Sequence, residues 1–321
     1  IALIRVMLSI TDKERNPVPV AKPEVSVEDE GGRSLLGPLK PFVNITRTAA
    51  GGVTKAAGVA YRETRQSIED PGRVLDAAKA GSIITAASAA VLTRLVVIPA
   101  DRPSVYRGDL GTTKQVVWSD PFSLLEVKRI GKTLGGTVND VLISVLTGAL
   151  RDYMISVGDD PDAGDLRAMV PVNLRAQDAP LELGNQFGLV YLSLPITVAD
   201  PLQRLYEVKR RMDILKSSPE SILTFQVLNA LGRMPGELAT TATSYFASKA
   251  SVVLTNVPGP QETLYLAGAP LRQLMFWVPQ SGDIGLGLSI ISYDGTVSVG
   301  IVVDEKLVEE PELILDFYLQ E

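Results

Sequence analysis

The sequence predicts an α/β fold. Beyond Pro99 the hydrophobic pattern alternates between the periods of amphipathic helices and of β-strands, as in α/β proteins. The hydrophobic fraction of 45% over 321 residues is also ample for a packed core. We therefore expect at least one α/β lobe in the second part of the chain.

Before that lobe, two segments differ in composition. Residues 1–10 read as the end of a helix, and residues 11–34 mix charge and proline with too little apolar surface to pack, which predicts an exposed connector. Residues 35–105 are rich in alanine and small residues and predict a helical linker. Between Lys79 and Arg94 lie 14 uncharged residues, fewer than the roughly 20 needed to cross a bilayer. A packed helix is favoured there, with an interfacial helix as the alternative.

The lobe, residues 106–321, is assigned element by element. Asp200-Pro201 supplies a helix cap followed by proline at the first helical position, and Asp294-Gly295 is typical of a type I′ hairpin turn. The periodicity predicts helices over 121–136, 138–158, 201–216 and 311–320, with two further helical stretches up to about residue 250. It predicts strands over 166–173, 187–196, 251–257, 273–279, 285–293 and 296–304.

Composition excludes several kinds of site. The net charge of -6 and the absence of a basic run give no electrostatic reason to bind nucleic acid. With no cysteine and no histidine, the chain has no thiolate nucleophile, histidine triad or zinc site of its own. The glycines of SGDIGLGLSI do not indicate a dinucleotide site, because this run leads into a hairpin strand instead of a helix.

The stretch GGTVNDVLISVL, residues 135–146, places an amide and a carboxylate where a helix begins. One interpretation is local: Thr137 caps the helix, and Asp140 completes a capping box three residues later. The other is that Asn139 and Asp140 brace an active site. The two roles are compatible, and the sequence leaves both open.

Four motifs in order carry a family resemblance: VNDV at 138–141, MVPVNLR at 169–175, LGNQFG at 183–188 and TNVPGPQETLYLAGAPL at 255–271. Together they resemble the bacterial wax ester synthase/acyl-CoA:diacylglycerol O-acyltransferase family, which belongs to the CoA-dependent acyltransferases with a chloramphenicol acetyltransferase-like fold. That fold implies a mixed sheet with flanking helices. The resemblance implies that residues 106–321 are the second lobe of a two-lobed enzyme. Residues 1–34 would then be the end of the first lobe with its connector.

The resemblance implies an O-acyltransferase that moves a fatty acyl group from acyl-CoA, its substrate, to a long-chain alcohol or diacylglycerol, with no cofactor and no metal. The family's base lies in an HHxxxDG motif that these residues lack, and the opening IALIRVML resembles the helix that follows it. We therefore expect the catalytic histidine to come from an N-terminal segment of the same precursor, and this chain alone to be inactive. The alternative is a non-catalytic homologue that binds lipid or a protein partner.

The same resemblance assigns candidate site residues. An aspartate in the first turn of a helix is favoured in its charged form, which makes Asp140 a weak base and a supporting residue beside Asn139. The implied substrate-binding residues are Asn185, Thr255, Asn256, Pro258, Gly259, Gly268 and Ala269.

Each substrate-binding assignment has a structural alternative. Pro258-Gly259-Pro260 is also a rigid turn, and Asn185 caps a turn as readily as it reaches a tunnel. Three aromatic side chains and several cations also have two interpretations each. Tyr265, Phe276 and Trp277 are more typical of a hydrophobic core than of an acyl tunnel. The cations of 201–216 are more typical of a solvated helix face than of a site for a CoA phosphate or lipid, and Arg175 suits a salt bridge as well as an anion site.

Water-insoluble substrates imply a cytoplasmic protein held peripherally at the inner membrane or at lipid droplets. Residues 75–98 are the candidate for that attachment.

Overall fold

The computed structural model describes residues 93, 95, 97–174, 187–218, 220–231, 236–280 and 282–321. The predicted connector and nearly all of the linker lie outside the described residues, so the boundaries at 34 and 105 stay predictions. Of the alanine-rich stretch, residues 93, 95 and 97 are described and are helical.

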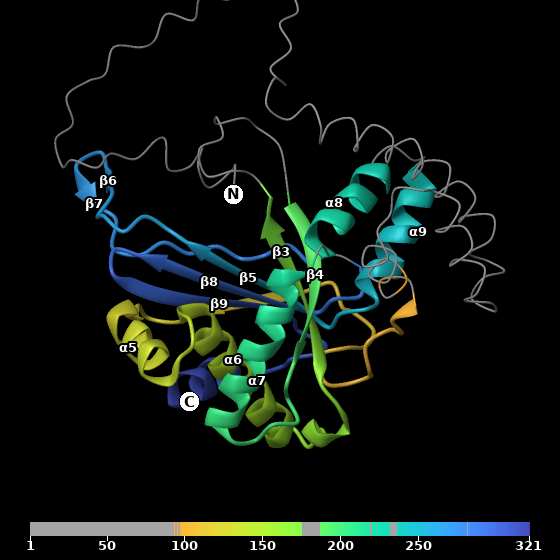
Figure 1. Ribbon diagram of the computed structural model, residues 1–321, viewed down its shortest axis with the longest axis horizontal. Helices are drawn as coiled ribbons and strands as arrows, with labels where there is room; N and C mark the ends of the chain where they lie inside the picture. The colour runs from red at the N-terminus through yellow and green to blue at the C-terminus, as the bar shows by residue number, and fades with distance from the viewer. Residues whose placement is uncertain are drawn as a thin grey trace, which may run out of the picture.

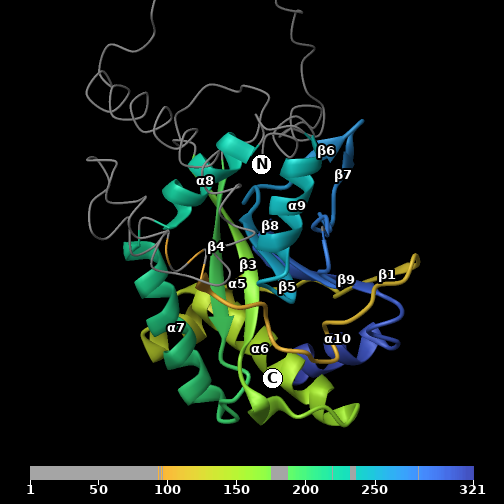
Figure 2. The ribbon, with the colours of Figure 1, turned by 90° about the vertical axis from the view of Figure 1, so that its right-hand side faces the viewer.

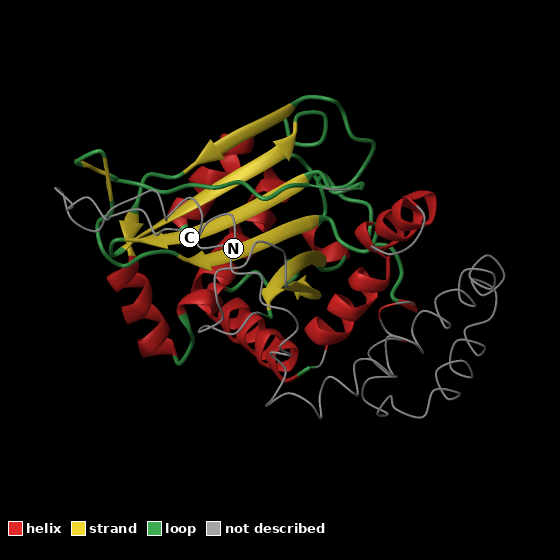
Figure 3. Ribbon diagram, turned by 90° about the horizontal axis from the view of Figure 1, so that it is seen from above, coloured by secondary structure: helices red, strands yellow, loops and turns green. Residues whose placement is uncertain are grey.

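The centre of the fold is a mixed sheet, as predicted (Figure 3). Its strand order is β1-β9-β8-β5-β3-β4, and the short β2 also pairs with β9. β5 runs parallel to both β3 and β8, whereas β1–β9, β8–β9 and β3–β4 are antiparallel. The strands are β1 Lys114–Trp118, β2 Phe122–Ser123, β3 Leu166–Asn173, β4 Phe187–Leu194, β5 Val252–Pro258, β6 Tyr265–Leu266, β7 Ala269–Pro270, β8 Leu286–Tyr293 and β9 Thr296–Asp304.

Helices cover one face of this sheet, where α5, α6 and α7 lie beneath the strands in Figure 1 and α10 lies beside α6 in Figure 2. Side chains at alternate strand positions, such as Leu254, Leu288 and Ile301, meet these helices in the main core. We call this face the helical face.

The described helices of the whole fold are α5 Leu124–Leu134, α6 Val138–Ser156, α7 Pro201–Ser217, α8 Glu220–Leu231, α9 Gly236–Ala247 and α10 Pro311–Gln320, with a 3₁₀ turn at Pro161–Ala163.

The opposite face carries a second, smaller core that includes Met169, Tyr191 and Val253. The prediction of a strand over 273–279 is wrong, because residues 271–280 form no strand and cross this face instead. The segment is bound by its backbone and by polar side chains: Phe276 accepts from Ser289 Oγ, and Gln273 donates to Ser298 Oγ at 2.9 Å. Val278 is buried and Phe276 is partly buried by packing on the sheet, and the hydrophobic pattern cannot distinguish this burial from burial inside the sheet.

The two edges of the sheet are treated differently. At β4, Thr224 Oγ1 of α8 accepts from Leu189 N–H at 2.8 Å, and Glu220 Oε1 accepts from Tyr191 N–H at 2.9 Å. α8 thus satisfies backbone groups that an edge strand leaves open. The other edge is β1, and none of the described strands pairs with its outer side.

Two hairpins complete the described chain. Asp294 and Gly295 have φ angles of 45° and 74°, which confirms the left-handed turn predicted between β8 and β9. β6 and β7 form a separate two-stranded ribbon that stands away from the sheet (Figure 1).

Among the described helices, none is by itself long and apolar enough to span a membrane. α5 and α6 taken together reach that length and composition, but they meet at a bend of 97°.

Candidate functional site

The first turn of α6 contains the capping box predicted from the sequence. Thr137 N–H donates to Asp140 Oδ2 at 2.8 Å, and Asp140 N–H donates to Thr137 Oγ1 at 3.2 Å. Asp140 is fully buried, and its second oxygen, Oδ1, has no hydrogen-bond partner among the described residues. A buried carboxylate oxygen without a donor is costly and calls for a partner. Capping therefore explains one oxygen of Asp140 and leaves the other available.

Asn139 joins this helix to the sheet. Asn256 Nδ2, from β5, donates to Asn139 Oδ1 at 2.8 Å. Both side chains are partly exposed. The structure thus brings three of the predicted residues, Asn139, Asp140 and Asn256, to one place on the helical face.

Thr255 does not lie with them. Successive side chains of a strand point to opposite faces, and Leu254 and Asn256 are on the helical face while Val253 packs in the second core. Thr255 therefore lies on the face opposite to Asn256, where it is partly exposed.

The turn after β5 is held by a close backbone contact. Gly259 N–H donates to Ser292 O at 2.9 Å, and a Cβ at Gly259 would overlap that same oxygen. The neighbouring Pro258 is exposed. This geometry accounts for a glycine at 259 on structural grounds, independently of any ligand.

Gly268 lies in the turn of the β6–β7 ribbon, and Ala269 is the first residue of β7. Ala267 and Gly268 have φ angles of 50° and 79°, and Ala269 is exposed. Figure 1 places this ribbon beyond the end of the sheet. Asn185 and Arg175 lie outside the described residues.

The three aromatic side chains considered for an acyl tunnel differ in their exposure. Tyr265 and Phe276 are partly buried, whereas Trp277 is 38% exposed and makes an edge-to-face contact with Trp118 at a centroid distance of 5.8 Å. The sequence did not single out Trp118.

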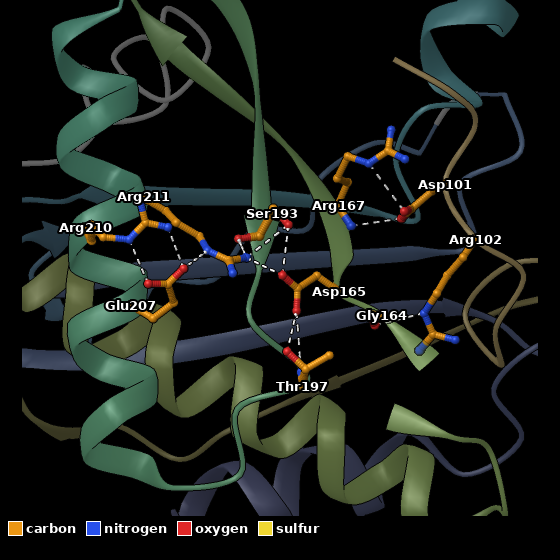
Figure 4. A network of polar contacts seen from close by, with 10 residues as sticks. All are labelled: Asp101, Arg102, Gly164, Asp165, Arg167, Ser193, Thr197, Glu207, Arg210 and Arg211. Carbon is orange, nitrogen blue, oxygen red and sulfur yellow. Dashed lines mark hydrogen bonds and ion pairs between the residues drawn. The ribbon is translucent and has the colours of Figure 1, made fainter. Parts of the chain in front are cut away.

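The cations of α7 are engaged in ion pairs, several of which belong to the network in Figure 4. Arg211 donates to Asp165 at 2.6 Å and to Glu207 at 2.7 Å, and Arg210 binds Glu207 through two nitrogens. The hydrogen bond from Arg210 is the main cause that lowers the pKa of Glu207 to about 2. The pairs along the helix are Arg204–Glu321, Lys209–Asp213, Arg210–Glu207, Arg211–Glu207, Arg211–Asp165 and Lys216–Asp213. Each cation of α7 thus has a carboxylate partner, so none of them requires a phosphate.

Two buried cations were missed at the sequence level. Arg204 is 1% exposed and binds Glu321 Oε1 and Oε2 at 2.6 and 2.7 Å. Lys249, also 1% exposed, donates to the carbonyl oxygens of Leu95 at 2.7 Å and Ile98 at 2.9 Å. Both sit in patterns that resemble solvated helix surface. In the described part of the chain, no three acidic side chains are placed to hold a metal ion.

The sequence is similar to proteins of known families. Residues 183–321 match the model of the WS/DGAT C-terminal domain. A putative diacylglycerol O-acyltransferase of Mycobacterium tuberculosis is 27% identical over 271 residues, which are 81% of this chain and 51% of that protein. The O-acyltransferase WSD of Acinetobacter baylyi is 32% identical over 184 residues, 56% of this chain and 40% of the relative.

A solved structure shows the same fold. The wax ester synthase/diacylglycerol acyltransferase of Marinobacter aquaeolei superposes with a TM-score of 0.57 at 17% identity, covering 99% of this chain and 61% of that one. The chain thus spans about half the length of the curated relatives it matches.

The mixed sheet with its flanking helices is therefore the α/β fold of that solved wax ester synthase/diacylglycerol acyltransferase. Residues 183–321 match the WS/DGAT C-terminal domain, and the chain is similar to the C-terminal part of proteins named wax ester synthase and diacylglycerol O-acyltransferase.

Proposed function

We propose that this chain is part of an O-acyltransferase that moves a fatty acyl group from acyl-CoA to a long-chain alcohol or to diacylglycerol. The observation that carries the proposal is the family match over residues 183–321, because the relatives bear the names wax ester synthase and diacylglycerol O-acyltransferase. Acyl-CoA acts as substrate, and no cofactor is required.

The reaction needs a base and an acid. The acceptor hydroxyl loses a proton as it attacks the thioester carbon, and the departing CoA sulfur gains one, so a histidine near neutral pKa serves both steps. The 321 residues contain no histidine. We assign the base to an N-terminal segment of the precursor that carries HHxxxDG.

Asp140 and Asn139 act as positioning residues in this proposal. The buried Oδ1 of Asp140 lacks a donor among the described residues, and an imidazole N–H or the backbone of the loop that carries it suits this acceptor. The Asn139–Asn256 hydrogen bond fixes the first turn of α6 to the end of β5. Together they would keep the histidine in one orientation toward the acceptor hydroxyl.

The test compares two variants that damage the same capping box. Thr137→Ala and Asp140→Ala each remove one of its two hydrogen bonds and should cost about 1 kcal/mol of stability. Only Asp140→Ala also removes the free oxygen. In the protein that includes the HHxxxDG segment, we expect Asp140→Ala to lower kcat for CoA release by at least ten times more than Thr137→Ala, with KM for acyl-CoA little changed.

A structural role alone predicts equal losses in the two variants, which would refute the positioning role. Absence of acyl transfer by the unmodified protein, with alcohol and diacylglycerol acceptors alike, would instead refute the function itself.

The substrate contacts belong to the same proposal. Thr255, Asn256 and Pro258 lie in the last part of β5, and Gly259 follows it. In the proposal these residues contact the substrates together with Asn185, Gly268 and Ala269. We also place the enzyme in the cytoplasm, peripherally bound to the inner membrane or to lipid droplets, because its substrates are insoluble in water.

A further inference from the structure

The outer edge of β1 presents backbone groups that have no partner among the residues that the structure describes. Ser119 N–H donates to Val299 O, and Glu305 N–H donates to Thr113 O. In an antiparallel ladder bonded residues alternate with non-bonded ones. In the register of β1 with β9, Gln115 and Val117 therefore face β9, while the N–H and C=O groups of Lys114, Val116 and Trp118 point outward. No described residue bonds to them.

The side chains along this edge are unusually apolar for a surface. Val116 is 45% exposed, Trp118 52% and Trp277 38%. Trp118 and Trp277 are the two tryptophans of the sequence, and they contact one another. Exposed aromatic and β-branched side chains that gather in this way mark interaction surfaces.

The protein protects its other edge, where Glu220 and Thr224 of α8 bond to β4. Natural sheets usually blunt an open edge with charges, proline or a covering element, because an open edge pairs with other strands. β1 has a single charge, Lys114, and Asp304 neutralises it at 2.7 Å. Figure 2 shows β1 at the rim of the molecule.

We propose that β1 pairs with β1 of a second copy of this chain in a two-fold antiparallel arrangement centred on Val116. The sequence of the strand, KQVVW, is self-complementary in that register. The outward groups of Val116 meet those of Val116 in the second copy, and Lys114 lies opposite Trp118 of the second copy. The methylene stem of Lys114 packs on that indole, so each edge satisfies the other.

A second strand suits this edge better than a lipid surface does. Hydrocarbon buries Trp118 and Val116 but gives no partner to the outward N–H and C=O groups, which then stay unsatisfied at a cost. An identical strand satisfies the backbone and the side chains together, and the two-fold axis closes the assembly at a dimer. The resulting sheet continues across both copies.

The first experiment measures the mass of the full chain by sedimentation velocity from low to high micromolar concentration. We expect a concentration-dependent dimer. Val116→Pro should weaken it by roughly tenfold or more, because proline removes an outward N–H that β9 does not use. Val116→Thr, which keeps the N–H and the β-branch, should remain dimeric. Far-ultraviolet circular dichroism verifies that each variant is folded.

A second pair of variants tests the register without proline. Trp118→Lys places like charges opposite Lys114 of the second copy and should weaken the dimer, whereas Trp118→Glu places opposite charges there and should weaken it less. A chain that is monomeric at every concentration overturns the proposal, as does a folded Val116→Pro variant that dimerises like wild type. A monomer that binds phosphatidylcholine vesicles and loses this binding in Trp118→Lys would assign the edge to lipid instead.

Discussion

Lys249 shows how burial alters a single residue. It is almost fully buried, its ammonium donates to the carbonyl oxygens of Leu95 and Ile98, and the ammonium lies 4.2 Å from the centroid of Tyr245. Burial, which disfavours the charged form, lowers the pKa of Lys249 to about 8, and repulsion from Arg167 acts in the same direction.

This pKa predicts the pH dependence of stability. In the unfolded chain a lysine keeps its proton up to about pH 10.4, whereas folded Lys249 loses its proton near pH 8. Between these values the unfolded state binds more protons, so the contribution of Lys249 to the free energy of unfolding rises with pH.

Lys249→Met should remove that rise. We expect the free energy of unfolding of wild type, minus that of the variant, to grow from pH 8 to pH 10 in urea denaturation. A difference that stays constant or falls over this range would contradict the assignment.

The residues of the candidate site were predictable to the extent that their contacts are local. The capping box joins Thr137 to Asp140, three positions apart, and the sequence predicts it fully. The bond between Asn139 and Asn256 spans 117 positions, and no local pattern contains that pairing. The unpartnered oxygen of Asp140 depends on packing from several elements, so only the structure reveals it.

At the scale of elements, periodicity predicted the long ones and missed the short ones. α5, α6, α7, α10 and strands β3, β4, β5, β8 and β9 all form within the predicted ranges or at most one residue beyond them. β1 was not predicted, because five residues give little periodic signal and its pairing with β9 comes from the far end of the chain. The prediction of a strand over 273–279 failed for another reason. The hydrophobic pattern there is typical of a strand, but the backbone of this segment bonds to side chains instead of to a neighbouring strand.

Gly188 of β4 allows α8 to lie close against the strand. A Cβ at this position would overlap the backbone of Ser221. Gly188→Ala should therefore push α8 away and destabilise the protein by roughly 1 to 3 kcal/mol.

Hydrogen exchange is the measurement, since the amides of Leu189 and Tyr191 bond to α8. Both should exchange faster in Gly188→Ala, while the amides of β9 keep their protection. Gly236→Ala is the matched control, because a Cβ there meets nothing within 4 Å. Unchanged exchange at Leu189 would show that α8 tolerates the displacement.

Arg204 ties three helices together. Its guanidinium reaches from α7 to the carbonyl of Ser144 in α6 at 3.2 Å and to Glu321 after α10. Removing one partner of a buried ion pair leaves the other charge buried without a partner and lowers the free energy of unfolding by several kcal/mol. Replacing both partners with apolar groups often lowers it little.

We therefore expect Glu321→Ala to destabilise the protein by roughly 3 kcal/mol, and the double variant Arg204→Met, Glu321→Met to be more stable than Glu321→Ala. Thermal unfolding of the two variants measures the difference. If the double variant were the less stable of the two, the carbonyl bonds of Arg204 would outweigh its charge pair.

At the scale of the whole molecule, the chain spans about half of the relatives it matches, and it holds a sheet with a main core of its own. The proposed reaction needs a histidine that these residues do not contain. We predict that the purified chain releases no CoA above background from palmitoyl-CoA with hexadecanol or diacylglycerol, and that adding the HHxxxDG segment restores release. Turnover by the chain alone would mean that another of its residues serves as the base.

The pairing of β1 with β9 also dictates when the protein can finish folding. β1 is among the first strands of the sheet to leave the ribosome, yet its partner Thr296–Asp304 is among the last. At translation rates of roughly 5–20 residues per second, β1 waits on the order of ten seconds or longer, with both of its edges open and Val116 and Trp118 uncovered. A nascent chain in that interval is a natural client for a chaperone that binds short apolar segments.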